Sequence, residues 1–383
     1  MMINSADIVV IGGGVIGCSI AYNLAKLGAG KVVLLERQYL ASGATGRCGA
    51  GVRMQWGTKT NCLLSRDSIR ILEHLPELLA VDVDIEFKQG GYLLLAYTDK
   101  MTNQFKKNLA LQNSLDIPSR WITPEEATEL VPYLNTEGLL GATFCAKDGH
   151  CNPFKVTSAY AQAARRLGVE IQTYTEVRNI LTEKGKVTAV RTTQGDIYTK
   201  VVIVAAGGHS KLIGRMIGVE LPIYPERHEI LVTEPVEPMQ GPMVMSFHHN
   251  LYCQQSPHGS FIMGIGHPDE PESFNTKSSW QFLCEMAERV VGLLPPLAGI
   301  NVIRQWAGLY DMSPDRQPIL GKTGEIEGFY TAVGFSGHGF MIAPVTGQVV
   351  AEMVLGKPTA LPVHMFNPGR FERGELFIEP SVV

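Results

Sequence analysis

The first forty residues combine short apolar runs, glycines and one amphipathic stretch. Residues Ile8–Ile11 are apolar, three glycines follow them, and a second apolar run covers Val32–Leu35. Short apolar runs that end at glycine are typical of buried strands, whereas the intervening residues Cys18–Leu27 repeat with the period of a helix. The pattern predicts a strand, a helix and a second strand.

The middle of the chain continues to switch between the helical and the strand period. Helical spacing and helix-start signals predict helices over 61–79, from Asp99 onward, from Thr123 and Pro124, over 153–167 and over 279–293. Alternating or continuous apolar spacing predicts strands over 85–97 (broken at Gly90-Gly91) and 169–173. It also predicts a β-meander over 187–192 and 197–200 that ends in a buried strand over 201–205, and several strands within 221–267.

The last part of the chain returns to the first kind of pattern, with a strand over 329–333, a glycine-rich turn and a helix over 345–355. We therefore expect a mixed α/β (α+β) fold in which two domains interleave. A Rossmann-like domain takes residues 1–84, 150–220 and 306–383. A substrate domain built on an antiparallel sheet takes residues 85–149 and 221–305.

The glycines after the first strand have the spacing of a dinucleotide-binding fingerprint. Gly12 permits a tight turn, Gly14 lets backbone N–H groups approach a pyrophosphate, and Gly17 allows the helix to pack on the sheet. Val15, Ile16 and Arg37 flank the same turn. Glu36, at the end of the second strand, is placed to accept hydrogen bonds from an adenosine ribose.

Composition restricts the class of function. The 383 residues are 45% hydrophobic and 18% charged with a net charge of −4, which favours a globular protein and gives no basic footprint for nucleic acid. Seven cysteines without a C-x-x-C pair indicate neither a disulfide framework nor a metal cage, so we expect a cytoplasmic protein. We expect no signal peptide and no membrane span. His248 and His249 would point to opposite faces of a strand, so no metal site is predicted.

Four further segments resemble one family. Residues 41–47 (ASGATGR), 205–207 (AAG), 306–318 (WAGLYDMSPDRQP) and 334–340 (GFSGHGF) resemble the flavin-dependent amino-acid oxidoreductases that include D-amino acid oxidase and sarcosine oxidase. Residues 47–53 (RCGAGVR) and 371–375 (FERGE) look closest to the β subunits of dye-linked L-proline dehydrogenases and hetero-oligomeric sarcosine oxidases.

The resemblance implies FAD as the cofactor, and the C-terminal glycine loop agrees with FAD over NAD. A glycine loop that opens a helix offers N–H groups and a positive dipole end to the anionic edge of a reduced flavin. Besides the fingerprint, the positions that the resemblance assigns to the cofactor are Ser42, Thr45, Gly46, Arg47, Gly49, Gly51, Val177, Ala206, Gly207, Gly308, Gly337, His338, Gly339, Phe340 and Met341. Val177 and His338 are equally consistent with simple packing roles.

Three departures from the monomeric sarcosine oxidase pattern are informative. Gly308 stands where that relative attaches its flavin through cysteine, so we expect non-covalent FAD. Met263 stands where it has a lysine that faces the flavin and assists oxygen reduction, so we expect a dehydrogenase. Met341 replaces a carboxylate-binding lysine, and Arg53 is our candidate for that task. Tyr252, His267 and Tyr310 match the relative's pocket residues.

The expected reaction is the removal of a hydride from the carbon that bears a secondary or primary amine, in proline, sarcosine or a similar amino acid, with transfer to flavin N5. Electrons would pass to a dye or to an α-type partner subunit, with FMN possible at the boundary near Arg47, Cys48 and the His150-Cys151 loop. Glycine, opine or hydroxyproline as substrate, an NAD-dependent dehydrogenase and a non-catalytic FAD scaffold remain as alternatives.

Overall fold

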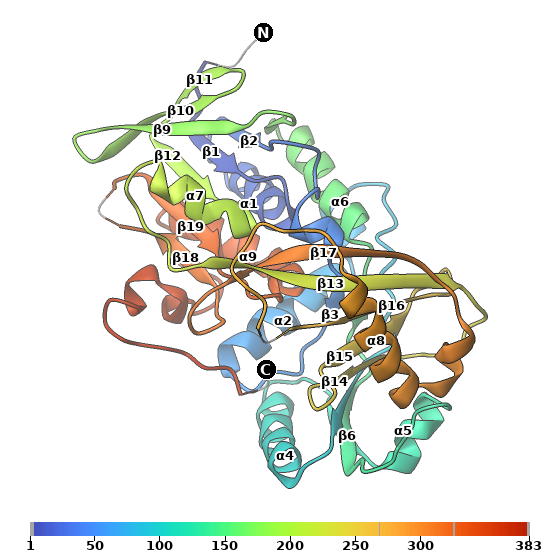
Figure 1. The fold of residues 1–383 in the computed structure, drawn as a ribbon. Coiled ribbons are helices and arrows are strands. Elements are labelled where there is room, and N and C mark those ends of the chain that lie inside the picture. The colour runs from blue at the N-terminus through green and yellow to red at the C-terminus, as the bar shows by residue number, and fades with distance from the viewer. Residues whose placement is uncertain (1–3, 268, 325, 381–383) are drawn as a thin grey trace.

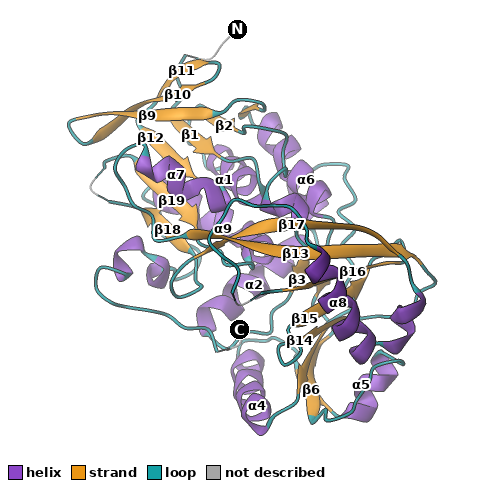
Figure 2. Ribbon diagram, in the orientation of Figure 1, coloured by secondary structure: helices purple, strands orange, loops and turns teal. Residues whose placement is uncertain are grey.

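The computed structural model describes residues 4–267, 269–324 and 326–380. Two large sheets organise it, with the N-terminal and C-terminal parts of the chain side by side in the upper half (Figure 1). Helices gather along one side of the first sheet and at the outer end of the second (Figure 2). The helices are α1 (Val15–Lys26), α2 (Lys59–Leu72), α3 (Leu75–Leu79), α4 (Asp99–Ser114), α5 (Pro124–Leu130), α6 (Pro153–Arg166), α7 (Ser210–Arg215), α8 (Trp280–Leu293) and α9 (Gly339–Val354).

The first sheet has six strands, parallel except for one antiparallel strand at its edge. Its order is β18 (Ile319–Lys322), β19 (Phe329–Val333), β12 (Val201–Val204), β1 (Ile8–Ile11), β2 (Val32–Leu35) and β8 (Glu170–Gln172). The side chains of successive β1 residues point to opposite faces of the sheet and pack in two different hydrophobic cores. Ile8 and Val10 pack with α1 and α9, whereas Val9 and Ile11 pack toward the β9–β11 sheet. Because both faces are covered, the strands are apolar throughout.

The second sheet has eight strands, and all neighbours are antiparallel except β4 and β14, which are parallel. Its order is β17 (Val302–Met312), β13 (Tyr224–Pro235), β16 (Ser260–Ile265), β15 (Leu251–Gln255), β14 (Met243–Ser246), β4 (Tyr92–Ala96), β6 (Gly141–Cys145) and β5 (Arg120–Ile122). One face packs on α5 and α8 through a core that includes Leu93, Phe261 and Met286. The other face packs on α4 at β4 and lines a cavity over β13, β15, β16 and β17.

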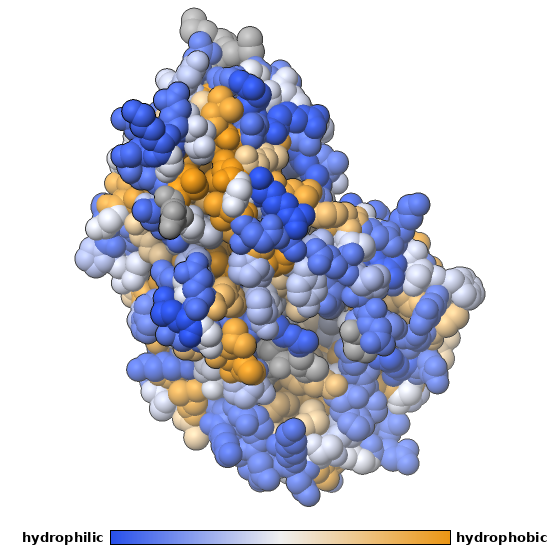
Figure 3. All heavy atoms as spheres, turned by 60° about the vertical axis from the view of Figure 1, so that its left-hand side comes forward, coloured by the Kyte–Doolittle hydropathy of each residue, from blue (hydrophilic) through white to orange (hydrophobic). Residues whose placement is uncertain are grey.

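Two smaller sheets complete the fold. A meander of β9 (Val177–Glu183), β10 (Lys186–Thr192) and β11 (Gly195–Tyr198) covers the six-stranded sheet. A short pair, β3 (Gly51–Val52) and β7 (Gly149–His150), joins the two halves. On the face drawn in Figure 3, hydrophobic residues reach the surface mainly in the upper half, whereas the lower half is largely hydrophilic. Among the described residues, no helix is long and apolar enough to cross a bilayer.

Local sequence signals account for several element boundaries. The expected helix start at Thr123 is confirmed: its hydroxyl accepts from Glu126 N at 3.3 Å, and the Glu126 carboxylate accepts from Thr123 N at 2.9 Å. This reciprocal capping box satisfies two N–H groups that a helix end otherwise leaves free. The expected meander and the strand over 201–205 are also present.

Four boundaries differ from expectation. The helix predicted over 61–79 is two helices, because the chain turns at His74 before Pro76. Residues 85–91 form no strand of a hairpin, and only β4 is regular there. The last helix begins at Gly339, well before 345, and it includes Pro344. Strand β17 pairs with β13 through Met312 rather than leaving the second sheet at 306. We propose two interleaved domains, one on each large sheet, with β17 in the second.

Candidate active site

A large cavity, of about 820 Å³, lies where the two large sheets meet. The ends of β1, β2 and β12, the segment after β2 and the start of α9 line it from one side. Residues of β13, β15, β16 and β17 line it from the other. Parallel strands place their carboxyl ends at one edge of a sheet, where ligands bind in this type of fold. The cavity therefore lies between the carboxyl edge of the first sheet, where ligands bind in this type of fold, and one face of the second sheet.

At the glycine turn after β1, the backbone passes very close to the backbone that follows β12. Gly12 has a φ of +119°, and a Cβ there would lie 2.3 Å from the Ala205 carbonyl oxygen. Gly14 immediately precedes α1 and lines the cavity, and Val15 N donates to Thr45 Oγ1 at 3.1 Å. The helix start leaves N–H groups without intrahelical acceptors, so this end suits a phosphate. Gly17 does not line the cavity; a Cβ there would lie 1.9 Å from Gly12 O, which fits its expected packing role.

Glu36 and its neighbours form the outer end of the cavity. The Glu36 carboxylate accepts from Gly13 N and from Gln38 N, each at 2.8 Å, so its position is fixed before any ligand binds. Arg37 contacts His209 at 3.1 Å, and Val177 lines the same end. A carboxylate oxygen accepts more than one hydrogen bond, so Glu36 retains capacity for a ribose hydroxyl.

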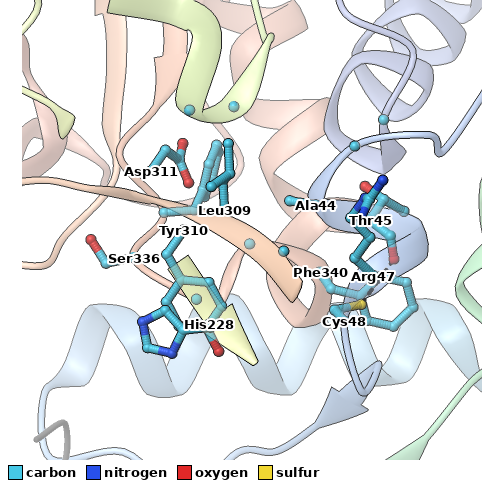
Figure 4. A pocket seen from close by; sticks show the side chains of 18 of the residues that line it. Ala44, Thr45, Arg47, Cys48, His228, Leu309, Tyr310, Asp311, Ser336 and Phe340 are labelled. Carbon is cyan, nitrogen blue, oxygen red and sulfur yellow. Dashed lines mark hydrogen bonds between the residues drawn. The ribbon is translucent and has the colours of Figure 1, made fainter. Parts of the chain in front are cut away.

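The segment after β2 forms the side wall. Ser42, Thr45, Arg47 and Gly49 line the cavity, as expected. Arg47 donates to Ala307 O at 2.9 Å and so ties this wall to β17. Figure 4 shows Ala44–Cys48 on one side of the cavity and Leu309–Asp311 on the other.

Gly46 and Gly51, which the resemblance assigns to the cofactor, lie behind the cavity wall and do not line it. A Cβ at Gly46 would lie 2.6 Å from the Phe154 ring, and one at Gly51 would lie 1.7 Å from the Tyr92 hydroxyl. They are glycines because neighbouring aromatic groups occupy the space that a side chain would need.

The C-terminal glycine loop closes the cavity. Gly337 has a φ of +92°, and a Cβ there would lie 2.2 Å from the Tyr310 ring. Helix α9 begins at Gly339, and Phe340 and Met341 line the cavity, as do Ala206, Gly207 and Gly308 on the adjoining walls. No acidic residue lies in the first turn of α9. Its N–H groups and positive dipole end are therefore available to an anionic edge.

His338 is buried beside this loop and is neutral at ordinary pH. Its exposed fraction is 3%, and burial, together with the charge of Arg53, lowers the pKa of the imidazole to about 4. Neither ring nitrogen has a hydrogen-bond partner among the residues that the structure describes. An unpartnered polar ring in a cavity wall is costly. The two nitrogens therefore fit a polar ligand.

Arg53 presents a buried cation to the same cavity. Its exposed fraction is 5%, and its guanidinium lies 4.1 Å from the centre of the Trp56 ring. Nε and Nη1 have no hydrogen-bond partner, and no carboxylate forms an ion pair with it in the described parts of the chain. Burial lowers the pKa of the guanidinium, but arginine keeps its charge in proteins. A buried unpaired cation is an anion site.

A buried carboxylate stands behind Arg53. Asp148 accepts from Met54 N at 2.7 Å and from Gln55 Nε2 at 2.9 Å, and burial raises the pKa of its carboxyl to about 7. Asp148 therefore fixes the backbone just after Arg53. The sequence analysis missed it, because an isolated Asp before a glycine resembles an ordinary turn.

The three aromatic pocket residues reach the cavity, with different exposures. Tyr252 and Tyr310 line it, and burial raises the pKa of both phenols, to about 12 for Tyr310. Tyr310 stacks on His228 with the ring centres 3.6 Å apart, and His228 Nε2 lies 2.9 Å from Glu226 (Figure 4). His267 lies at the mouth and is exposed. The sequence analysis named Tyr310 but missed His228 and Glu226, which lie far from it in the sequence.

Met263 does not face the cavity, which corrects the expectation for this residue. It is buried in the core of the second sheet, where it lies opposite Leu231 and Cys253. Successive side chains of a strand point to opposite faces, and its neighbour Gly264 is the one that lines the cavity. Met263 therefore does not occupy the position of a lysine that faces the flavin. Among the described residues, no lysine lines the cavity.

Two further expectations about histidines are wrong. His150 and Cys151 are buried, so their loop is not a surface for a second flavin or a partner. His248 and His249 lie in a turn, not on a strand, and both rings contact Tyr97. No group of three or more possible metal ligands occurs among the described residues.

Comparison with known proteins identifies the family. Residues 7–353 match the FAD dependent oxidoreductase family, and the chain belongs to it. The resemblance found in the sequence is therefore confirmed, as is the fold class. The chain is an oxidoreductase and a flavoprotein whose cofactor is FAD. The glycine turn, the start of α9 and the unpartnered His338 ring are groups that could hold it.

Particular relatives share nearly the whole chain. It is 32% identical to sarcosine oxidase subunit beta of Arthrobacter sp, over 98% of this chain and 93% of that one. It is 30% identical to the same subunit of Rhodobacter capsulatus, over 98% and 91%. The crystal structure of L-proline dehydrogenase from P. horikoshii superimposes with a TM-score of 0.93 at 38% identity, covering 98% of this chain and all of that one.

The buried His150 predicts a specific pH dependence of stability. Burial, with the nearby Lys88, lowers the pKa of its imidazole from 6.5 to about 4. A lowered pKa stabilises the fold above 6.5, and this contribution is lost as the pH falls toward 4. Relative to His150→Gln, the wild type should therefore lose about 2 kcal/mol of unfolding free energy between pH 7 and pH 5.

Urea unfolding at the two pH values measures this difference. His258→Gln is the control, because His258 is exposed beside Glu86. An equal pH response in the wild type and His150→Gln would show that His150 protonates freely in the folded protein.

Proposed function

We propose that this protein is an FAD-dependent dehydrogenase that oxidises the C–N bond of a secondary or primary amino acid, such as proline or sarcosine. The observation that carries the proposal is the buried, unpaired Arg53 guanidinium in the same cavity as the cofactor cradle. An amino acid supplies the carboxylate that such a guanidinium lacks. The names of the relatives, sarcosine oxidase subunit beta and L-proline dehydrogenase, support this substrate class.

The residues of the cavity have separate tasks in this proposal. Bound FAD supplies the two-electron acceptor for the oxidation. Arg53 binds the carboxylate, and the Trp56 ring against it limits the directions in which the guanidinium can move. Tyr252 and Tyr310 form the walls, remain protonated because burial raises the pKa of each phenol, and exclude water from the substrate. Fixing the substrate in one orientation lowers the entropic cost of reaction.

We also propose that electrons leave to a partner subunit. Among the described residues, no lysine lines the cavity to stabilise a reduced oxygen species, and Arg47 already donates to Ala307 O and Ser42 O. The names of the two β-subunit relatives support an α-type partner, with FMN at the boundary as one form of the next carrier. The buried His150-Cys151 loop is not part of that boundary.

The substrate proposal is tested by mixing the yellow protein with single amino acids in the absence of oxygen. Proline, sarcosine or a close analogue should bleach the flavin absorbance. Arg53→Lys should raise the KM about 100-fold with a smaller effect on kcat, because it loses paired, charge-assisted hydrogen bonds. Arg120→Lys, on the surface beside Glu126, is the control. Bleaching by no amino acid would favour a non-catalytic scaffold, and an unchanged KM in Arg53→Lys would refute its carboxylate role.

The link between protein and FAD is expected to be non-covalent. Gly308 has no side chain to attach a flavin, and a Cβ there would lie 3.2 Å from Arg47 Cβ. Precipitation with acid should release all flavin absorbance into the supernatant. Yellow colour that stays in the washed pellet would contradict this expectation.

The electron acceptor is tested by comparing turnover with an artificial dye and with oxygen. Turnover with the dye should exceed peroxide formation at least about tenfold, because in this proposal Arg53 is engaged by the substrate carboxylate and Arg47 by backbone carbonyls, which leaves neither cation to stabilise charge on oxygen. Stopped-flow reoxidation of the reduced enzyme gives both rates. Comparable rates would assign the protein to the oxidases.

A further inference from the structure

The C-terminal segment crosses the molecule and is held by buried charges. Arg370 forms a paired ion contact with Asp315, at 2.8 and 2.9 Å, and neither side chain is exposed. Phe377 N donates to the same carboxylate at 3.3 Å. Two residues later Glu379 is buried, with an exposed fraction of 3%. The segment is therefore anchored before it reaches Glu379.

Glu379 joins the segment to the start of α2. Its carboxylate accepts from Gly57 N at 2.6 Å, from Thr58 Oγ1 at 2.6 Å and from Asn61 Nδ2 at 2.9 Å. Thr58, the residue before α2, makes no side-chain cap of its own. A carboxylate is the group favoured at a helix N-terminus. A residue more than 300 positions away therefore caps this helix.

The capped residues continue directly into the proposed carboxylate site. Trp56 precedes Gly57, its Nε1 donates to Arg53 O at 3.1 Å, and its ring lies against the Arg53 guanidinium and 5.2 Å from the His338 ring. Asp148 fixes Met54 and Gln55 from the other side. Residues 53–58 are thus held at one end by Asp148 and at the other by Glu379.

We propose that Glu379 is a positioning residue for Arg53, so that the C-terminal segment sets the affinity of the site for the substrate carboxylate. The inference rests on the proposed role of Arg53. A binding group must be held within about 0.5 Å of its productive position, and its supporting contacts supply that constraint. Without the Glu379 contacts, Gly57 and Trp56 gain freedom, and the guanidinium is no longer fixed in the cavity.

The contacts of the C-terminal segment allow the positioning role of Glu379 to be tested separately from its effect on stability. The Arg370–Asp315 pair anchors the segment independently of Glu379. Glu379→Gln keeps the size of the side chain, but its amide nitrogen cannot accept, so either Gly57 N or the pair of donors on Thr58 and Asn61 loses its acceptor. Glu379→Asp keeps the charge with a shorter reach. Glu375→Gln, in an exposed ion pair with Arg373 on the same segment, is the matched control.

The experiment measures binding of pyrrole-2-carboxylate and pyrrole-2-carboxamide to the FAD-loaded enzyme by calorimetry. These probes are planar analogues of proline that differ only in the group facing Arg53. Glu379→Gln should weaken the carboxylate about tenfold and the carboxamide less than twofold, Glu379→Asp should restore part of the loss, and Glu375→Gln should match the wild type. With the amino acid that bleaches the flavin, KM should rise more than kcat falls.

The outcomes distinguish this inference from the proposed function. If Arg53→Lys loses the carboxylate preference and Glu379→Gln keeps it, the positioning role is wrong and the role of Arg53 stands. Equal weakening of both probes in Glu379→Gln would mean general loosening and would also overturn the inference. If the wild type itself shows no preference for the carboxylate, the role of Arg53 fails, and the inference fails with it.

Discussion

A buried guanidinium without a paired carboxylate is the constraint on which the site depends. Removing a charge from water costs several kcal/mol unless hydrogen bonds or an opposite charge compensate for it. At Arg53 the compensation within the described chain comes from the Trp56 ring and from the more distant charges of Asp148 and Glu379. This compensation does not cover the whole cost of burying the charge, and an anionic ligand can offset the rest. The surrounding structure has to hold the cation in place until that ligand arrives.

The fold meets this requirement by placing unrelated segments around one short stretch of chain. Residues 53–58 donate hydrogen bonds to Asp148 in the loop before β7 and to Glu379 in the C-terminal segment, and Trp56 also contacts His338 at the start of α9. The cofactor edge and the substrate side consequently share a wall. A displacement of residues on the cofactor side therefore shifts residues on the substrate side, because close-packed interiors transmit strain.

The sequence predicts the local parts of this structure better than the parts made by distant contacts. The glycine turn at Gly12, the cap at Thr123 and the buried strands follow from spacing and turn chemistry, because neighbouring residues determine them. The roles of Asp148, His228 and Glu379 depend on residues far away in the sequence, and no local pattern marks them. Met263 was misplaced for a related reason: a match of residue spacing to a relative does not fix the face of a strand, since a shift by one residue reverses it.

The strand order of the six-stranded sheet has a consequence for how the enzyme is made. Its central strand, β1, pairs with β12 and β2, and β19 and α9 come from the end of the chain. The cofactor cradle combines Gly12 with Gly339, so a ribosome has to deliver the more than 300 residues between them before the cradle exists. At about 5–20 residues per second, synthesis leaves the first strand waiting tens of seconds for its partners. Flavin loading is thus a late, largely post-translational event, and the nascent β1 needs protection from aggregation until then.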